Sequence, residues 1–219
     1  MGGICVGKEF YYEVKTPANY DENKKYPILI AFHGIGHHEE FAWINFDGVT
    51  DEFIVVGVRG NLEFKNGYAY YLLEGFGKPD MASFDECIKK MPAFVKGIIE
   101  KYPVDKDHVY LGGFSQGAIL SNTLALLMGE TISGIVSMNG YVPEFLEERY
   151  GVKSVEHLEV FLSDGKEDEI FPPEIGQKNE AYFREKGAEV SYTTYDTAHQ
   201  IGEENKKEVA RWLLDQIKK

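Results

Sequence analysis

The sequence predicts a single α/β domain in which a mainly parallel central sheet carries helices on both faces. Three observations indicate this class. Short β-like runs alternate with helical patterns along the chain. One segment, 118–128, is apolar nearly all round, as expected of a helix buried against the centre of a sheet. The 219 residues contain no repeat or linker that would divide them, so we expect one domain over residues 1–219.

The β-like runs are rich in apolar, β-branched and aromatic residues. They cover Phe10 to Val14, Pro27 to His33, Phe53 to Val58, His108 to Phe114, Ser133 to Met138, His157 to Ser163 and Val190 to Tyr195. Because helical patterns separate most of these runs, the strands should be mainly parallel. Ligands bind such sheets at the carboxyl ends of the strands, which is where a site is expected.

Helix signals are clearest after residue 80. Ser83 and Glu86 have the spacing of a capping box, so we expect a helix to begin at Ser83, with a kink at Pro92. Cys87 lies on its apolar stripe, which favours a buried core thiol over a nucleophile. The last helix, over 203–218, is amphipathic.

Composition limits the partners and the compartment. The formal net charge of -13 opposes binding to phosphate backbones, so nucleic-acid binding is not expected. Two cysteines cannot form a disulfide framework, and residues 1–8 lack an apolar run long enough for a secretory signal, so we expect a cytoplasmic protein. No apolar stretch approaches the length of a membrane span.

Gly113-Phe114-Ser115-Gln116-Gly117 matches G-x-S-x-G, the pattern of a nucleophilic serine on a sharp strand-to-helix turn. The match alone is weak, and a plain glycine-rich turn is the alternative. Its context strengthens the prediction, because a β-like run precedes it and the buried helix follows it. The amino end of that helix would also direct N–H groups towards an oxyanion at Ser115.

A serine hydroxyl needs a base and an orienting acid, expected in the chain order serine, acid, histidine. His199 lies between the last β-like run and the last helix, as the base should. Asp164 and Asp168 both follow the preceding run, and the motif does not decide between them. Asp196, only three residues before His199, is the weakest candidate.

The second oxyanion donor should lie in the loop after the run that ends at His33. We therefore expect the backbone N–H groups of Ile35 and Gln116 to serve, with His33 structural. His37 and His38 with two glutamates lack the spacing of a zinc site, and no phosphate loop or dinucleotide motif occurs. Neither a metal nor a cofactor is expected.

With these motifs placed, the chain resembles the phospholipase/carboxylesterase family of α/β-hydrolase serine esterases, which includes the acyl-protein thioesterases. The resemblance spans most of the chain. It is carried by His33 to Gly36, Gly113 to Ala118, Asn139 to Pro143, Gly165 to Asp168 with Pro172, and His199 to Ile201. It implies an α/β-hydrolase fold with little or no cap. It also implies that Asp168, not Asp164, is the acid.

Two features depart from the family pattern. Ala198 precedes the histidine where a glycine is common, and the segment 61–80 lacks the usual aromatic-arginine stretch. Tyr70, Tyr71 and Phe76 in that segment are candidates either for an acyl pocket or for core packing.

We therefore expect hydrolysis of carboxylic esters or thioesters of small, relatively apolar acyl groups through an acyl-serine intermediate. The alternatives are a serine peptidase on the same fold and a catalytically silent binding module. The expected partner is a small-molecule ester. A homodimer would be one way to cover apolar surface near the pocket.

Overall fold

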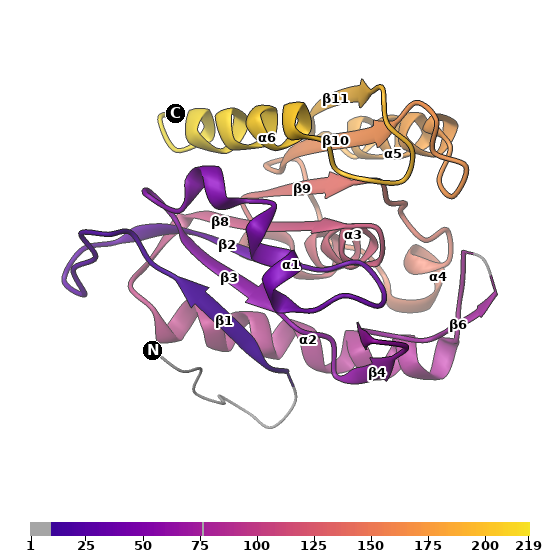
Figure 1. Cartoon of the computed structure of the whole chain (residues 1–219), viewed down its shortest axis with the longest axis horizontal. Helices are drawn as coiled ribbons and strands as arrows, with labels where there is room; N and C mark the ends of the chain where they lie inside the picture. Colours follow the sequence, from indigo (N-terminus) through magenta and orange to yellow (C-terminus); the bar gives the residue numbers. More distant parts are fainter. Residues whose placement is uncertain (1–9, 76) are drawn as a thin grey trace.

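A seven-stranded sheet forms the centre of the computed structural model, which describes residues 10–75 and 77–219. The strands are β1 (Tyr12–Lys15), β2 (Tyr26–Phe32), β3 (Ile54–Val58), β8 (Val104–Phe114), β9 (Gly134–Met138), β10 (Glu159–Gly165) and β11 (Glu189–Tyr195). They lie in the order β1-β3-β2-β8-β9-β10-β11 (Figure 1). Only β1 runs antiparallel to its neighbour. The predicted, mainly parallel sheet is confirmed. Residues 1–8, which lack the apolar run of a secretory signal, lie outside the described residues.

Helices cover both faces of this sheet. The α-helices are α1 (Glu39–Ile44), α2 (Met81–Lys101), α3 (Gln116–Met128), α4 (Leu146–Tyr150), α5 (Pro173–Glu185) and α6 (Glu203–Gln216), with short 3-10 helices η1 (Asp47–Val49) and η2 (Gly129–Thr131). In Figure 1, α1 and α6 lie on one side of the sheet and α2 and α3 on the other. None of the helices in the described ranges is both long and apolar enough to cross a bilayer.

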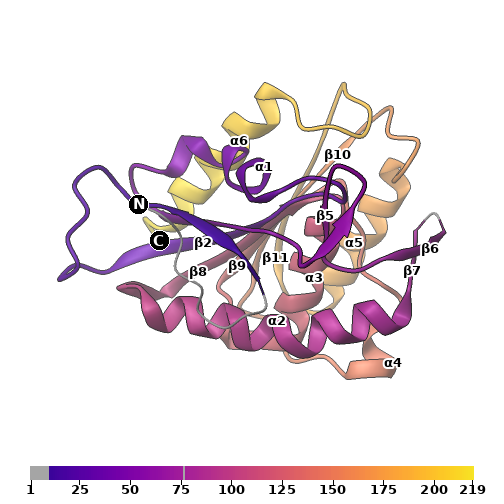
Figure 2. The same ribbon diagram turned by 60° about the horizontal axis from the view of Figure 1, so that its bottom comes forward.

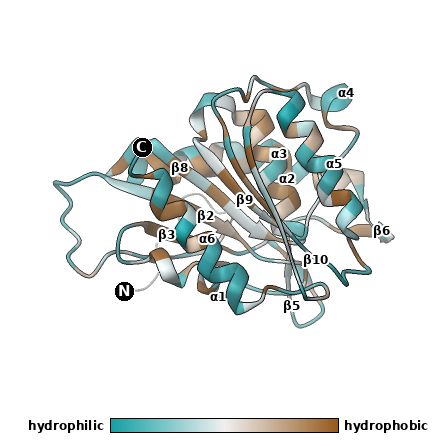
Figure 3. Cartoon of the chain, turned by 90° about the horizontal axis from the view of Figure 1, so that it is seen from above, coloured by the Kyte–Doolittle hydropathy of each residue, from teal (hydrophilic) through white to brown (hydrophobic). Residues whose placement is uncertain are grey.

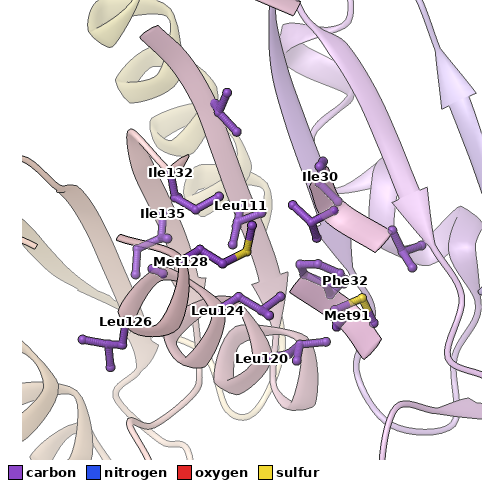
Figure 4. Close-up of a cluster of buried hydrophobic side chains, with 14 of the residues drawn as sticks. Ile30, Phe32, Met91, Leu111, Leu120, Leu124, Leu126, Met128, Ile132 and Ile135 are labelled. Carbon is purple, nitrogen blue, oxygen red and sulfur yellow. The ribbon is translucent and has the colours of Figure 1, made fainter. Parts of the chain in front are cut away.

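The strands bury side chains on both faces, because successive residues of a strand point to opposite sides. On β2, Ile30 and Phe32 join the cluster that includes Met91 of α2 and Leu120 of α3, as Figure 4 shows. Leu29 joins the opposite cluster, with residues of α1 and α6. Figure 3 shows hydrophobic residues gathered along the central strands and hydrophilic residues along much of α6. Helix α3 is buried on nearly every side, as its composition predicted.

Helix α2 begins earlier than the capping-box spacing predicted. Asp80 is the N-cap, and its Oδ1 accepts a 2.9 Å hydrogen bond from the Ser83 N–H. The Ser83 hydroxyl accepts instead from the Leu72 N–H at 2.9 Å, so it ties the preceding segment to the helix. The prediction that the helix begins at Ser83 is therefore wrong. The apolar stripe with Cys87 is buried as expected, and the helix continues beyond Pro92 to Lys101.

Between β3 and α2 the chain forms two short hairpins. One pairs β4 (Leu62–Phe64) with β5 (Gly67–Ala69), and the other pairs β6 (Leu73–Gly75) with β7 (Lys78–Pro79). Figure 2 shows β6 and β7 beside the end of α2. The hairpin of β4 and β5 also contacts the loop after β2, where Gly36 donates to the Tyr68 carbonyl at 2.8 Å. These hairpins are far smaller than a cap domain.

Candidate functional site

Ser115 stands on the turn between β8 and α3 in a conformation that residues other than glycine rarely adopt. Its φ is 54° and its ψ is -117°. Backbone strain of this kind persists only where the surroundings hold it. Here the Ser115 N–H donates to the carbonyl of Met138, at the end of the adjacent strand β9, over 3.0 Å. The hydroxyl is thereby fixed at the carboxyl end of the sheet.

The two glycines of the motif allow the turn to pack closely. A Cβ on Gly117 would lie 2.1 Å from the carbonyl oxygen of Phe32, and one on Gly113 would lie 2.3 Å from the carbonyl carbon of Gly117. Both neighbours are backbone atoms that cannot move away. The G-x-S-x-G pattern therefore reflects the close approach of β8, α3 and β2.

The predicted serine, histidine and aspartate form a line of hydrogen bonds. His199 Nε2 lies 2.9 Å from Ser115 Oγ, and His199 Nδ1 lies 2.7 Å from Asp168 Oδ2. Asp168 follows β10 and His199 follows β11, and these strands are parallel neighbours, so their carboxyl-end loops meet. With a proton on Nδ1, Nε2 is free to accept the serine proton.

Asp168 is buried, with 3% of its surface exposed, and both carboxylate oxygens accept hydrogen bonds. Oδ1 accepts from the N–H groups of Ile170 at 2.8 Å and Phe171 at 2.9 Å. Oδ2 also accepts from the Asn139 amide at 2.8 Å. Burial alone raises the pKa of Asp168, but the bonds from His199, Asn139 and Phe171 outweigh it and hold the pKa below its usual value. Asp168 is therefore ionised at neutral pH.

Sequence reasoning named Asn139 only as part of the family resemblance and missed its contact with Asp168. The residue follows β9 with a φ of 52°, a left-handed conformation that asparagine tolerates better than most side chains. This turn directs its amide to Asp168. An asparagine directly after a predicted strand was the available signal.

The other two acid candidates do not contact His199. Asp164 packs in the interior against Gly176, where a Cβ would lie only 1.7 Å from Asp164 Oδ2. Burial raises the pKa of Asp164 to about 7, and the negative charge of Asp168 acts in the same direction. Asp196 is exposed and pairs with Lys166 at 2.7 Å. The structure thus brings Asp168 alone of the three to His199.

Ile35 and Gln116 have the positions expected of oxyanion donors. Ile35 lies in the turn after β2, Gln116 is the first residue of α3, and within the described residues the backbone N–H groups of both have no hydrogen-bond partner. The Gln116 side chain has a second task that the sequence did not indicate. Its Oε1 accepts from the Tyr70 N–H at 2.9 Å, and its Nε2 donates to the Tyr71 carbonyl at 2.8 Å.

His33 is fully buried and holds the same loop. Its Nε2 accepts from the Gly60 N–H at 3.0 Å, which leaves Nδ1 to donate to the Gly34 carbonyl at 2.7 Å. Burial lowers the pKa of His33 to about 4, so the ring is neutral near pH 7. These contacts agree with the structural role expected of His33.

Tyr70 and Tyr71 lie in the core rather than along a pocket, with 1% and 0% of their surfaces exposed. The Tyr70 hydroxyl donates to the Val58 carbonyl at 2.6 Å and accepts from the His33 N–H at 3.0 Å. Tyr71 packs edge-on against Phe84 of α2. For these two tyrosines the structure therefore favours core packing over an acyl pocket. Phe76 lies outside the described residues.

A cavity of about 270 Å³ opens beside Ser115 and His199. It is lined by Gly34, Ile35, His37, Leu73, Gly77, Phe114, Ser115, Ile170, Phe171 and His199. Ile170, Phe171 and Gly77 also line a larger groove of about 720 Å³ that extends to α4 and α5 past Tyr141. The cavity and the groove are therefore neighbours, and together we call them the channel; its walls are mainly apolar, with charged side chains such as Glu147 and Lys178 at the far end of the groove.

No group of three or more metal-ligating side chains is found within residues 10–75 and 77–219. In the histidine-rich loop after β2, the ring of His37 stacks on Phe41 instead of meeting a second ligand.

The chain is similar to several known proteins. "Acyl-protein thioesterase 1" of Candida albicans is 23% identical and aligns over 94% of this chain and 98% of its own length. The protein of the same name from Debaryomyces hansenii is 26% identical over 66% of this chain and 65% of its own length. The crystal structure of the Bacillus cereus carboxylesterase superposes with a TM-score of 0.80 at 20% identity, covering 94% of each chain.

The structural likeness identifies the α/β-hydrolase fold that the sequence predicted. The family model for phospholipase/carboxylesterase matches residues 18–215, nearly the whole chain. The chain therefore belongs to the phospholipase/carboxylesterase family.

Proposed function

We propose that this protein is a serine hydrolase that cleaves carboxylic esters or thioesters through an acyl-Ser115 intermediate. The observation that carries the proposal is the unbroken hydrogen-bonded line from Ser115 through His199 to Asp168. Family membership and the thioesterase and carboxylesterase relatives support the same chemistry.

In the acylation step, Ser115 Oγ attacks the carbonyl carbon while His199 Nε2 takes the hydroxyl proton. The ionised Asp168 stabilises the imidazolium that forms and holds its ring in place. The carbonyl oxygen becomes an oxyanion facing the N–H groups of Ile35 and Gln116. Such donors typically contribute about 3 to 4 kcal/mol each to the transition state.

The reaction is then completed in two stages, release of the alcohol or thiol and hydrolysis of the acyl-serine. His199 gives its proton to the departing alcohol or thiol, and the acyl group stays on Ser115. A water molecule enters, and its oxygen attacks the acyl carbon while His199 takes one of its protons. The bond to Ser115 Oγ then breaks, His199 returns the proton to Oγ, and the carboxylic acid leaves. No step requires a metal or a cofactor.

The substrate we propose is a small-molecule ester or thioester with a relatively apolar acyl group. The support lies in the channel, where Ile170 and Phe171 continue from the cavity into the groove and Tyr141 and Val142 follow. Apolar walls stabilise an apolar arm by removing it from water. The volume of the groove suits an arm of several carbon atoms.

For the setting of this enzyme we propose the cytoplasm and a substrate other than nucleic acid. The net charge of -13 and the presence of only two cysteines support both points. We also propose that a homodimer forms over the exposed side chains of Leu72, Leu73 and Ile170, the last two of which line the cavity. Sedimentation velocity with wild type and Leu73→Glu tests the dimer.

The function is tested by hydrolysis of p-nitrophenyl esters from acetate to palmitate, with wild type and Ser115→Ala side by side. We expect the wild type to hydrolyse the short and medium esters, and Ser115→Ala to lose several orders of magnitude in turnover. Equal rates for the two proteins, or no activity on any ester in the series, would count against the proposal.

A further inference from the structure

The cavity beside Ser115 contains a polar side chain that the proposed reaction does not use. Apart from Ser115 and His199, its described walls are glycines and apolar side chains, with the one exception of His37. His37 lies in the loop after β2, two residues beyond Ile35. His37 therefore borders the space that a substrate of Ser115 must occupy.

The position of His37 is fixed by its neighbours. Its N–H donates to the Gly34 carbonyl at 3.2 Å, and its carbonyl accepts from the Tyr68 N–H of β5 at 2.8 Å. Its ring stacks on Phe41, with ring centres 3.9 Å apart and an angle of 18° between the planes. Phe41 packs against Phe114, and Phe114 packs against His199. One series of aromatic contacts therefore joins the His37 ring to the His199 ring.

The ring nitrogens of His37 can form hydrogen bonds with a substrate. Partial burial, with a smaller contribution from His38, lowers the pKa of His37, so its ring is neutral at neutral pH. A neutral imidazole has one donor and one acceptor nitrogen. In the described parts of the chain neither ring nitrogen has a hydrogen-bond partner. A hydroxyl group, which both donates and accepts, is the substrate group that suits either nitrogen.

We propose that His37 is a specificity-determining residue, whose imidazole hydrogen-bonds a hydroxyl group carried by the substrate close to the scissile bond. This inference rests on the proposed esterase function of Ser115. The cavity of about 270 Å³ is small, so the hydroxyl must lie within a few bonds of the ester carbonyl. The apolar groove takes the other arm. The substrate class is thus a hydroxy ester or thioester with one apolar arm.

The test uses two pairs of esters in which a methyl group replaces a hydroxyl of similar size. Ethyl lactate and ethyl isobutyrate differ on the acyl side, whereas 2-hydroxyethyl butyrate and propyl butyrate differ on the alcohol side. Initial rates by pH-stat titration give kcat/KM for wild type, His37→Phe, His37→Gln and His38→Phe. The exposed His38 does not line the cavity, so its variant is the matched control.

We expect the wild type to prefer the hydroxyl ester about tenfold in one pair, and that pair identifies the arm that His37 contacts. In that pair the preference should fall to about one in His37→Phe, mainly through KM. It should be retained in part by His37→Gln, whose amide still forms hydrogen bonds. His38→Phe should keep the full preference.

Two results would overturn the inference: a wild type without preference in either pair, or a His37→Phe variant that keeps it. Thermal unfolding and labelling of Ser115 by a fluorophosphonate show whether His37→Phe is folded and its serine activated. If His37→Phe fails these controls, His37→Ala takes its place. Loss of the preference in both His37→Ala and His37→Gln then counts against the inference. If the wild type hydrolyses none of the four esters or the p-nitrophenyl series, the proposed function itself fails.

Discussion

The side-chain amide of Asn139 donates a 2.8 Å hydrogen bond to Oδ2 of Asp168. The same oxygen faces His199 Nδ1 at 2.7 Å, so the amide helps both to hold the carboxylate in place and to keep it ionised. The bond depends on the left-handed backbone of Asn139, which follows directly after β9.

We predict that Asn139→Gly lowers kcat about tenfold, because the carboxylate loses one of its charge-assisted hydrogen bonds. Glycine accepts the φ of 52° without strain, so the fold should be retained. Asn139→Ala should lose similar activity and also about 1 kcal/mol of stability, because alanine disfavours this φ. Ester hydrolysis and urea unfolding measure the two effects. Unchanged kcat in both variants would refute a role for the amide.

Replacement of the two neighbouring aspartates should have unequal effects. We expect Asp168→Asn to lower turnover by about four orders of magnitude, because the amide no longer stabilises the imidazolium and favours the wrong tautomer of His199. Asp164→Asn should change turnover little, because Asp164 does not contact His199. Kinetics with one p-nitrophenyl ester decide the matter, and the reverse order of effects would make Asp164 the acid.

Asp164 should instead affect how stability depends on pH. Its pKa is about 7 in the folded protein and about 3.9 when the chain is unfolded. Between these values the folded state keeps a proton that the unfolded state has lost, so stability falls as pH rises through this range. Above pH 7 the buried carboxylate is charged and the loss is complete.

We therefore predict that Asp164→Asn, which has no proton to lose, gains stability relative to wild type from pH 5 to pH 8. The difference in the free energy of unfolding, from urea titrations at both pH values, measures this gain. Asp196→Asn, at an exposed carboxylate, serves as the control and should give a constant difference. A constant difference for Asp164→Asn as well would mean that Asp164 is already ionised at pH 5.

The Gln116 side chain should matter for stability rather than chemistry. We predict that Gln116→Met lowers the free energy of unfolding by about 1–3 kcal/mol for each backbone group left unpaired, at Tyr70 and Tyr71. Gln177→Met on the exposed face of α5 is the matched control and should change stability by less than about 0.5 kcal/mol. Equal stabilities of the two variants in urea would show that the two hydrogen bonds of the Gln116 side chain contribute nothing.

Much of the fold was predictable because its signals are local. Each strand of the central sheet lies within or beside a predicted β-like run, and α3 was recognisable from its apolar composition. The start of α2 was not, since Asp80 and Ser83 are both good capping residues. In the structure Asp80 is the N-cap, and the Ser83 hydroxyl accepts a hydrogen bond from Leu72, eleven residues earlier in the chain, which no local pattern indicates.

Some residues of the site were likewise predictable from the sequence, and others were not. Ser115 was predictable from a motif whose glycines are required by backbone contacts, and His199 was predictable from chain order. The choice between Asp164 and Asp168 needed the family resemblance, because both follow the same predicted β-like run. In the structure Asp164 is part of β10, and Asp168 lies in the loop after it. Tyr70 and Tyr71 could not be assigned from sequence, since an aromatic side chain looks the same in a core and in a pocket.

The central claim is that Ser115 is an activated nucleophile, and covalent labelling tests it most directly. Wild type, Ser115→Ala and His199→Ala are incubated with a fluorophosphonate, and the labelled peptide is identified by mass spectrometry. The account predicts one label on Ser115 in the wild type, none in Ser115→Ala and greatly slowed labelling in His199→Ala. A properly folded wild type that stays unlabelled, or a label on another residue, would contradict it.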